Sequence, residues 1–290
     1  DLVEQVNQRC SKRKYLAEEE KDIEEEKMQQ IQRYIEKINN LQNIVKISYI
    51  QDGSKILKPM FVKFIKNAKK IIVFEIIQDI RPLADVLIGL LGELLVLFLT
   101  KLQLGTVWMG GDGLFYSSED IQKYFQSKNE FPICIPFGYA ADPKCILRKR
   151  KTVEQLADQW PEAEMNLFEC LNRAPTAMNQ QQFKLKLEKD GILISPLKKD
   201  IGILKFNWLD AGIAAAHAAV WFKNVKLEIQ DGAIKISQSN EQKSQFEVPK
   251  NIQIIDKSDK DPRKVIKACV NGILIGGVFL VGLLAYNLLK

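Results

Sequence analysis

The chain has 290 residues, 46% of them hydrophobic and 27% charged, which is an ordinary globular composition with enough length for a large core. The net charge of +6 slightly favours anionic partners, but Lys and Arg alternate with Asp and Glu, which argues against a nucleic-acid-binding protein. The five cysteines are scattered, odd in number and without a C-x-x-C pair, so we expect a reducing compartment and neither a disulfide framework nor a zinc site.

The stretch RCSKRKY near the N-terminus places Arg9, Ser11 and Arg13 at alternate positions. Alternate side chains of an extended segment point to the same side. Two guanidinium groups and a hydroxyl would then face one anion. The competing interpretation is an exposed basic segment with no ligand.

A charged amphipathic helix is predicted over residues Ala17–Ile38. We interpret its run of acidic residues as a solvated face rather than a binding tail. The apolar residues near one face of this helix are Ile23, Ile31, Tyr34, Ile35 and Ile38.

The apolar stretch Leu83–Leu99 is short for a membrane span and contains Asp85 and Glu93, so we predict a buried core helix. It is followed by LGTVWMGGDG, a glycine-rich turn without the spacing of a dinucleotide or phosphate-binding loop. The only histidine, His217, lies in AGIAAAHAAV, where helix packing is a better explanation than chemistry. One histidine also cannot make a His-rich metal site.

Two further stretches carry polar groups suited to binding. The stretch FGYAADPKCILRKRK ends a predicted strand and then presents Arg148, Lys149 and Arg150. The stretch APTAMNQQQF offers Asn179 and Gln181, whose side-chain amides both donate and accept hydrogen bonds. Such amides suit a heterocycle edge with mixed donors and acceptors, such as the pyrimidine ring of a flavin.

The chain also contains a weak internal repeat. VKISYIQDG, Val45 to Gly53, aligns without gaps on FKLKLEKDG, Phe183 to Gly191, and both are alternating strands that end in an Asp-Gly turn signal. Each is followed by a glycine-opened apolar helix, after a longer interval in the first half. We therefore predict two α+β repeats, residues 1–150 and 151–262.

The last segment is predicted to anchor the protein in a membrane. Residues 268–289 are 22 residues without a charge, which as a helix would span about 33 Å. Basic residues precede them, and Gly272 and Gly276 form a G-x-x-x-G face for another helix. We therefore assign residues 263–290 to a single C-terminal transmembrane helix. Because the chain begins with Asp1 rather than Met, we also expect an N-terminal piece that was either removed by processing or lies outside this sequence.

In this order, the four binding stretches resemble the FMN-dependent nitroreductase family. Its members show R-x-S-x-R near the N-terminus, P-[ST]-x-x-N-x-Q, L-G-T-V-W after the central helix, and G-Y-P before a basic cluster. The resemblance covers most of residues 7–222. Three positions depart from the family pattern: Gln182 replaces the usual Pro, Phe183 the usual Trp, and Ala140 the Pro after Gly-Tyr.

The resemblance implies a fused dimer. Family members are usually homodimers with FMN at the interface, where one subunit supplies R-x-S-x-R and the other P-[ST]-x-x-N-x-Q. Here each half of the chain keeps the motif that the other lacks. The implied fold is α+β and nitroreductase-like, with two fused repeats forming a pseudo-dimer with one composite FMN site, plus the C-terminal transmembrane helix.

On this resemblance Arg9, Ser11 and Arg13 hold the phosphate and ribityl end of FMN, with Arg148 or Arg150 assisting. The ring and its chain would face Thr176, Asn179 and Gln181. The turn that would line the site consists of Gly105, Thr106, Val107 and Trp108. No side chain is assigned a catalytic role and no metal ligand is expected, because the flavin performs the redox chemistry.

Two functions follow from these expectations. The first is a membrane-anchored FMN-binding oxidoreductase that reduces quinone-like or nitroaromatic substrates with NAD(P)H. The second is a catalytically silent accessory subunit of a membrane complex, such as a mitochondrial respiratory complex. Both predict a membrane location, with a mitochondrial membrane as one candidate, and neither involves nucleic acid.

Overall fold

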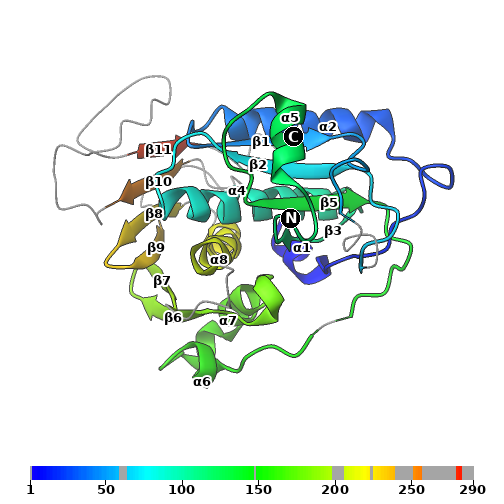
Figure 1. The fold of residues 1–290 in the computed structure, drawn as a ribbon. Coiled ribbons are helices and arrows are strands. Elements are labelled where there is room, and N and C mark those ends of the chain that lie inside the picture. The colour runs from blue at the N-terminus through cyan, green and yellow to red at the C-terminus, as the bar shows by residue number, and fades with distance from the viewer. Residues whose placement is uncertain are drawn as a thin grey trace. The chain divides into compact units, whose positions relative to one another are not determined.

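The computed structural model describes residues 2–58, 64–146, 148–197, 206–222 and 225–238, and the backbone of 251–256 and 279–282 (Figure 1). The chain forms two compact units. The first unit comprises Asp1–Asn39, Ile44–Asp79 and Leu95–Arg148. The second comprises Asn40–Asn43, Ile80–Leu94 and Lys149–Lys290. The main division, between residues 148 and 149, falls beside the predicted boundary at residue 150, but the two-repeat, pseudo-dimer organisation stays a prediction.

The first unit contains a five-stranded antiparallel sheet with strand order β1-β2-β5-β3, in which β4 also pairs with β5. The predicted strand at Val45 is confirmed as β1 and pairs with β2 from Val45↔Ile76 to Ile50↔Ile71. The strands are β1 (Val45–Ile50), β2 (Ile71–Ile76), β3 (Gly105–Thr106), β4 (Met109–Gly110) and β5 (Ile133–Gly138). The helices that begin and end in this unit are α1 (Leu2–Gln8), α2 (Glu25–Asn39) and α5 (Ser118–Phe125).

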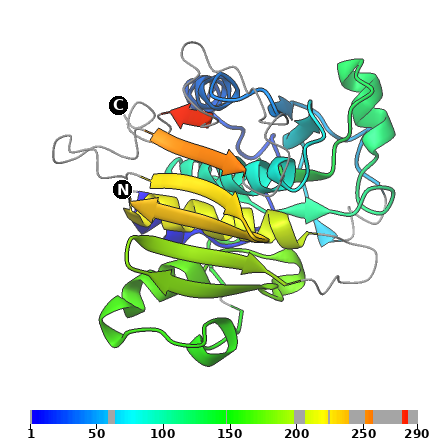
Figure 2. The ribbon, with the colours of Figure 1, turned by 90° about the vertical axis from the view of Figure 1, so that its left-hand side faces the viewer.

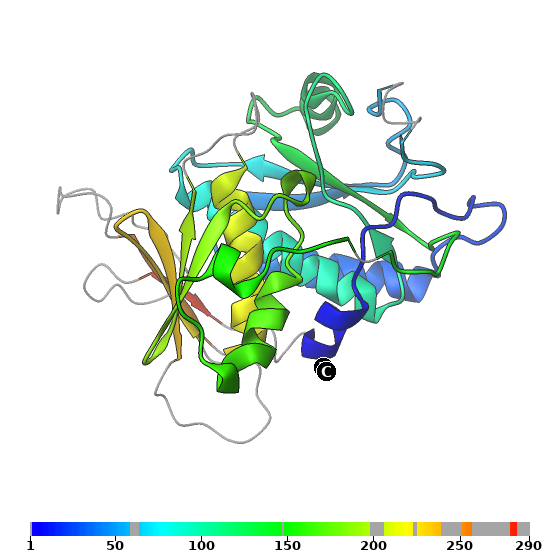
Figure 3. The same ribbon diagram turned by 90° about the horizontal axis from the view of Figure 1, so that it is seen from below.

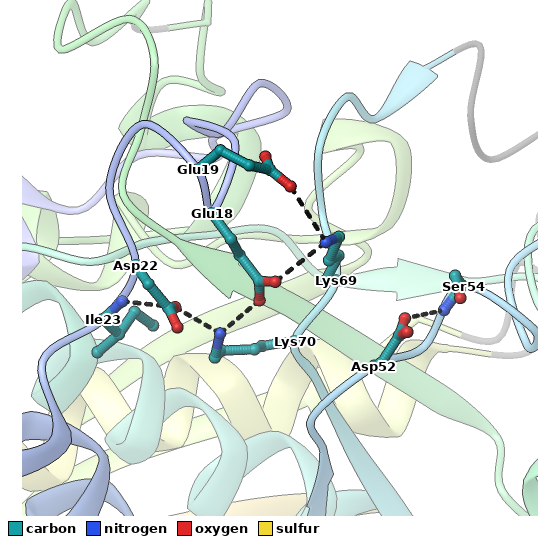
Figure 4. A network of polar contacts seen from close by, with 8 residues as sticks. All are labelled: Glu18, Glu19, Asp22, Ile23, Asp52, Ser54, Lys69 and Lys70. Atoms are coloured by element: carbon teal, nitrogen blue, oxygen red, sulfur yellow. Dashed lines mark hydrogen bonds and ion pairs between the residues drawn. The ribbon is translucent and has the colours of Figure 1, made fainter.

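Helix α2 begins later than predicted. The helix was expected from Ala17, yet residues 18–20 form a turn and α2 starts at Glu25. Most of the acidic side chains before it are exposed, as predicted, but two of them are also tied to a distant lysine. Glu18 and Asp22 each accept a hydrogen bond of 2.6 Å from the buried ammonium group of Lys70, 48 residues or more along the chain (Figure 4). These long-range ion pairs hold residues 18–22 against the start of β2 and out of the helix.

The apolar face predicted for this helix is present in α2. Ile31, Tyr34, Ile35 and Ile38 are buried together with Met28, and Tyr34 stacks on Phe98 with ring centroids 4.2 Å apart. Ile23 is also buried, although it lies outside the helix. Fully burying one such side chain contributes about 1.5–3 kcal/mol.

Helix α4 (Leu83–Lys101) confirms the predicted core helix. Most of its side chains are fully buried, including Glu93. Within the described residues it is the one helix with the length and hydropathy of a membrane span, and 89% of the relevant window is buried inside the protein. Burial of this kind is what a core helix of a globular protein shows.

The second unit contains a six-stranded sheet with order β11-β10-β8-β9-β7-β6, seen across its strands in Figure 2. All neighbours are antiparallel except β10 and β8. The strands are β6 (Phe183–Glu188), β7 (Gly191–Pro196), β8 (Val225–Gln230), β9 (Ala233–Gln238), β10 (Asn251–Asp256) and β11 (Phe279–Gly282). The helical elements are α6 (Val153–Leu156), η1 (Glu162–Glu164), α7 (Met165–Asn172), η2 (Ala177–Asn179) and α8 (Asn207–Phe222).

The predicted strand at Phe183 is confirmed as β6, which forms a hairpin with β7 in the register Glu188↔Gly191. Gly191 is needed for a reason other than the turn. A Cβ atom there would lie 2.0 Å from the carbonyl oxygen of Ile236 in β9, so the glycine allows β7 and β9 to approach each other.

Helix α8 packs on one face of this sheet, beside α7 (Figure 3). Within this unit α8 also crosses the first part of α4 at two glycines. A Cβ on Gly89 would lie 2.2 Å from the Leu209 carbonyl oxygen, and one on Gly212 would lie 2.4 Å from that of Val86. The two helices therefore touch backbone to backbone at this crossing.

His217 serves packing, as predicted. It is fully buried in α8, with Nδ1 2.8 Å from the carbonyl oxygen of Cys170 and Nε2 3.1 Å from a carboxylate oxygen of Glu93. Because a carbonyl oxygen can only accept, Nδ1 carries a hydrogen. One further hydrogen is then shared between Nε2 and Glu93, and the pair joins α8 to α4 and α7.

Most of the predicted transmembrane helix, residues 268–289, lies outside the described residues. The backbone of Phe279–Gly282 is described, and it forms strand β11, paired antiparallel with β10, instead of the expected helix.

Candidate functional site

The segment from Arg9 to Tyr15 is extended, as its alternating pattern predicts. Ser11 forms a parallel bridge with Thr106, and the Lys12 amide donates to the Thr106 carbonyl oxygen at 2.8 Å. On its other side, the Lys66 amide donates to the carbonyl oxygen of Arg13 at 2.9 Å. The segment is thus held between two neighbouring stretches of backbone, and its successive side chains point to opposite sides.

Tyr15 anchors this segment, a role that the sequence did not suggest. Its ring is almost fully buried, and its hydroxyl lies 2.9 Å from the carbonyl oxygen of Lys12 and 3.1 Å from that of Pro136. Burial raises the pKa of this hydroxyl far above its ordinary value, so it stays protonated and donates to these carbonyls. An aromatic residue that ends a basic segment was the available signal.

The predicted turn Gly105–Trp108 lies against this segment. A Cβ on Gly105 would come within 2.8 Å of side-chain atoms of Lys12, so only glycine lets the segment approach β3 so closely. Thr106 and Val107 are buried, and the Trp108 ring stacks on Phe74 with centroids 5.6 Å apart. The turn therefore positions the basic segment rather than projecting polar side chains of its own.

Arg13 and Arg148 bring two positive charges together in the first unit. Both side chains are exposed to solvent. The pKa of Arg13 is lowered by partial loss of solvation and, next, by the positive charge of Arg148. Two guanidinium groups that repel each other in this way are stabilised by an anion placed between them.

The stretch from Thr176 to Gln181 is strained. Met178, Asn179 and Gln181 have φ values of 53°, 59° and 47°, in the left-handed region that non-glycine residues rarely adopt. The backbone amide of Gln181 donates to the side-chain hydroxyl oxygen of Thr176 at 3.0 Å, and this hydrogen bond closes the loop. Clustered strain of this kind persists only where the surroundings hold it, and it is common at binding sites.

Arg150 is one of the groups that hold this loop. Its guanidinium donates to the backbone carbonyl of Asn172 at 2.6 Å, to that of Ala174, and to the side-chain oxygen of Asn179. The Asn179 amide nitrogen in turn donates to the carbonyl oxygen of Lys149 at 2.9 Å. The guanidinium of Arg150 therefore binds protein groups. Of the two arginines predicted to assist with the phosphate, Arg148 is the better placed to bind a ligand.

Gln181 is also committed to the chain. It is fully buried, and its side-chain oxygen accepts from the Lys151 amide at 2.8 Å. Its side-chain nitrogen donates to the side-chain oxygen of Asn172 at 2.5 Å. The two amides singled out in the sequence thus fasten residues 149–151 to the loop.

Asp210 completes the support and was missed by the sequence reasoning. It lies in the first turn of α8, is 2% exposed, and accepts from the Ala177 amide at 3.0 and 3.1 Å through its two carboxylate oxygens. Burial raises the pKa of this carboxyl to about 7, against the opposing effects of the Ala177 hydrogen bond and the Arg150 charge. The signal that could have found it is an acidic residue opening an otherwise apolar helix.

The structure thus places the predicted residues in two groups. Arg9, Ser11, Arg13, Gly105–Trp108 and Arg148 belong to the first unit, and Arg150, Thr176, Asn179 and Gln181 to the second. Among the residues described, no cluster of three His, Cys, Asp or Glu side chains could hold a metal ion.

Comparison with known proteins identifies relatives. Residues 1–221 match the sequence model of a family described as "Putative TM nitroreductase". A crystal structure described as a "putative nitroreductase" from Thermotoga maritima has 21% identity and a TM-score of 0.56, over 82% of this chain and 93% of that one. This likeness shows the nitroreductase fold and confirms the predicted α+β class.

Two shorter relatives were solved with FMN bound. The one from Desulfovibrio desulfuricans is 18% identical, with a TM-score of 0.41 over 53% of this chain and 94% of its own. The one from Desulfitobacterium hafniense is 16% identical, with a TM-score of 0.40 over 51% of this chain and 95% of its own. No curated protein matches the sequence.

Proposed function

We propose, from the premise that this chain belongs to the nitroreductase family whose sequence model covers residues 1–221, that it is an FMN-binding oxidoreductase. Its substrates would be quinone-like or nitroaromatic compounds, and NAD(P)H would be the electron donor. The observation that carries the proposal is a pair of exposed guanidinium groups whose positive charges act on each other, Arg13 and Arg148, beside an extended segment fixed on β3.

The phosphate end of FMN fits the first unit. A phosphate dianion would relieve the repulsion that lowers the pKa of Arg13. Arg9 and Ser11 stand at the alternate positions of the same segment, so both would bind that end of the cofactor. The bound flavin would supply the hydride and electron transfer, and the chain would bind and orient it.

The ring end is assigned to the loop that contains Thr176 and Asn179. Its support by Arg150, Lys151 and Asp210 suits a rigid surface for a planar ring. For Gln181 and Arg150 we propose an indirect role, in which they support the loop without contacting the flavin, because their side chains already bind protein groups. The assignment of both residue groups to one flavin rests on the way the motifs are divided along the sequence, and it predicts one FMN per chain.

Flavin stoichiometry tests this proposal. The absorbance of freshly isolated protein should show about one FMN per chain. Arg13→Ala should weaken FMN binding by roughly ten- to a hundred-fold, because it removes a charge-assisted hydrogen bond. Lys14→Ala, the neighbouring exposed cation on the other side of the segment, should change it little. Two flavins per chain would contradict the single composite site, and none would contradict flavin binding.

We further propose that residues 263–290 anchor the protein in a membrane, with a mitochondrial membrane as one candidate location. The support is the sequence itself: 22 uncharged residues preceded by Arg263, Lys264 and Lys267. Other subunits of a membrane complex would then be partners through the G-x-x-x-G face.

The alternative function is a catalytically silent accessory subunit of such a complex. One observation favours it: the amides of Asn179 and Gln181 and the guanidinium of Arg150 are occupied by protein groups. NAD(P)H oxidation with a quinone, measured on protein supplied with FMN, separates the two functions. Turnover would support the oxidoreductase, and flavin binding without turnover would support the silent subunit.

A further inference from the structure

Two cysteines far apart in the sequence lie on neighbouring segments of the first unit. Residues 14–16 pair antiparallel with residues 139–141: Tyr15 is bridged to Ala140, and the Ala141 amide donates to the Lys14 carbonyl oxygen at 2.9 Å. In an antiparallel pair, each residue toward the N-terminus of one segment lies opposite one residue further toward the C-terminus of the other. If this register continues for five residues beyond the Tyr15–Ala140 bridge, Cys10 lies opposite Cys145.

Lys12 holds the two segments together where the backbone pairing ends. Its ammonium group donates to the carbonyl oxygen of Asp142 at 2.8 Å and to that of Lys144 at 2.7 Å. Both carbonyls lie just before Cys145, so Lys12 keeps that cysteine beside the segment that carries Cys10.

The two thiols are neighbours and are open to reagents. Cys10 is close enough to Cys145 to raise the pKa of its thiol. Cys145 is exposed and Cys10 is partly exposed, whereas Cys134 and Cys170 are buried. We propose that Cys10 and Cys145 are a redox-active dithiol, which a peroxide converts into a disulfide within the chain.

The reaction balances with hydrogen peroxide as the oxidant. One thiolate attacks the O–O bond and becomes a sulfenic acid, with release of water. The second thiol then displaces the sulfenic oxygen as a second water, and the S–S bond forms. Two thiols and one peroxide give one disulfide and two waters, so the sulfurs are oxidised and the peroxide is reduced.

The Cys145 thiol is protonated at neutral pH. Partial loss of solvation and, next, the neighbouring Cys10 raise the pKa of Cys145 to about 11. Thiolates are the reactive form, so attack by Cys145 should be slow at neutral pH and faster as the pH rises. Cys10 also lies between Arg9 and Ser11, so the cross-link would be set within the candidate phosphate-binding segment.

Peptide mapping tests the cross-link and requires no flavin. The full-length protein is treated with hydrogen peroxide, alkylated and digested without reductant. We expect a peptide pair joined through Cys10 and Cys145, whose mass is two hydrogens lower than the sum of the two reduced peptides. Cys10→Ser and Cys145→Ser should abolish it, and Cys269→Ser should leave it unchanged. A sulfinic acid at either cysteine without the cross-link, or a disulfide only between chains, would overturn the proposal.

A second pair of variants tests the geometry rather than the thiols. Lys12→Met keeps both cysteines but removes the bonds to Asp142 and Lys144, so the rate of cross-linking should fall several-fold. Lys14→Met alters the neighbouring exposed lysine and should leave the rate unchanged. Equal rates for these two variants would show that the paired segments do not bring the thiols together, and would overturn the structural basis of the proposal.

Discussion

Asp210 is a buried carboxyl that supports a strained loop. Its pKa is raised by burial to about 7, while the same group in an unfolded chain titrates near 4. The folded protein therefore binds this proton more tightly than the unfolded chain. Stability from this proton is fully present below about pH 4 and is lost as the pH rises toward 7.

Asp210→Asn should remove this pH dependence. The asparagine oxygen can still accept from the Ala177 amide, but the side chain no longer titrates. The unprotonated carboxylate costs the native protein at most about 4 kcal/mol, because the pKa of the folded protein lies roughly three above that of the unfolded chain. Urea unfolding at pH 5 and pH 8 measures the effect: the native chain should lose more stability than the variant between these values. Parallel losses in both proteins would contradict the prediction.

Lys70 is a second residue whose contribution to the free energy of unfolding depends on its neighbours. Its ammonium is buried and bonded to Glu18 and Asp22, which are themselves partly exposed (Figure 4). Lys70→Met should lower the free energy of unfolding by about 1–3 kcal/mol, since the freed carboxylates can be rehydrated in part. Lys69→Met, beside it but 42% exposed, should cost less than about 1 kcal/mol. Similar losses for the two variants, measured by urea unfolding, would refute the distinction.

At the scale of elements, the crossing of α4 and α8 depends on two glycines. A Cβ on Gly89 would lie 2.2 Å from the Leu209 carbonyl oxygen and 2.8 Å from the Ile213 amide nitrogen, both backbone atoms of α8. The clash in Gly89→Ala should cost up to about 3 kcal/mol. The gain of about 1 kcal/mol in helix propensity offsets part of this cost, so the protein should be destabilised by at most about 2 kcal/mol.

Gly138→Ala is the matched control for this change. Its Cβ would meet a side-chain atom of Tyr15 at 3.3 Å, where a small adjustment suffices. Thermal unfolding of the two variants should show the larger drop in midpoint for Gly89→Ala. An unchanged midpoint for that variant would mean that the helices can separate slightly without cost.

The sequence predicted an element correctly where contacts between residues near each other in the sequence determine it, and failed where contacts with distant residues do. Hydrophobic periodicity correctly indicated α4, β1 and β6, and alternation indicated the extended segment at Arg9. The start of α2 could not be found this way, because Lys70 draws residues 18–22 into ion pairs. The amides of Asn179 and Gln181 were found as a motif, but their partners Arg150 and Lys151 lie some 30 residues earlier and became visible only in the fold.

At the scale of the whole molecule, the family match and the C-terminal tail concern different parts of the chain. The family model ends at residue 221, and the uncharged stretch begins at residue 268. Strand β10 lies between them and pairs with β8 and β11. Removal of residues 263–290 would leave the matched region and β10 in place and would remove β11.

This truncation tests the proposed anchor. If residues 268–289 insert into a bilayer, their apolar length holds the full chain on membranes through washing with alkaline carbonate. The truncated chain should then appear in the soluble fraction, with its flavin content unchanged, because the candidate cofactor residues all precede residue 182. A matched variant with two arginines in place of Leu280 and Val281 should also be released, since each charge at the centre of a span costs about 2.5–3.5 kcal/mol. Full-length protein that washes off with carbonate would contradict the anchor and favour the place that β11 has in the structure, as a strand paired with β10.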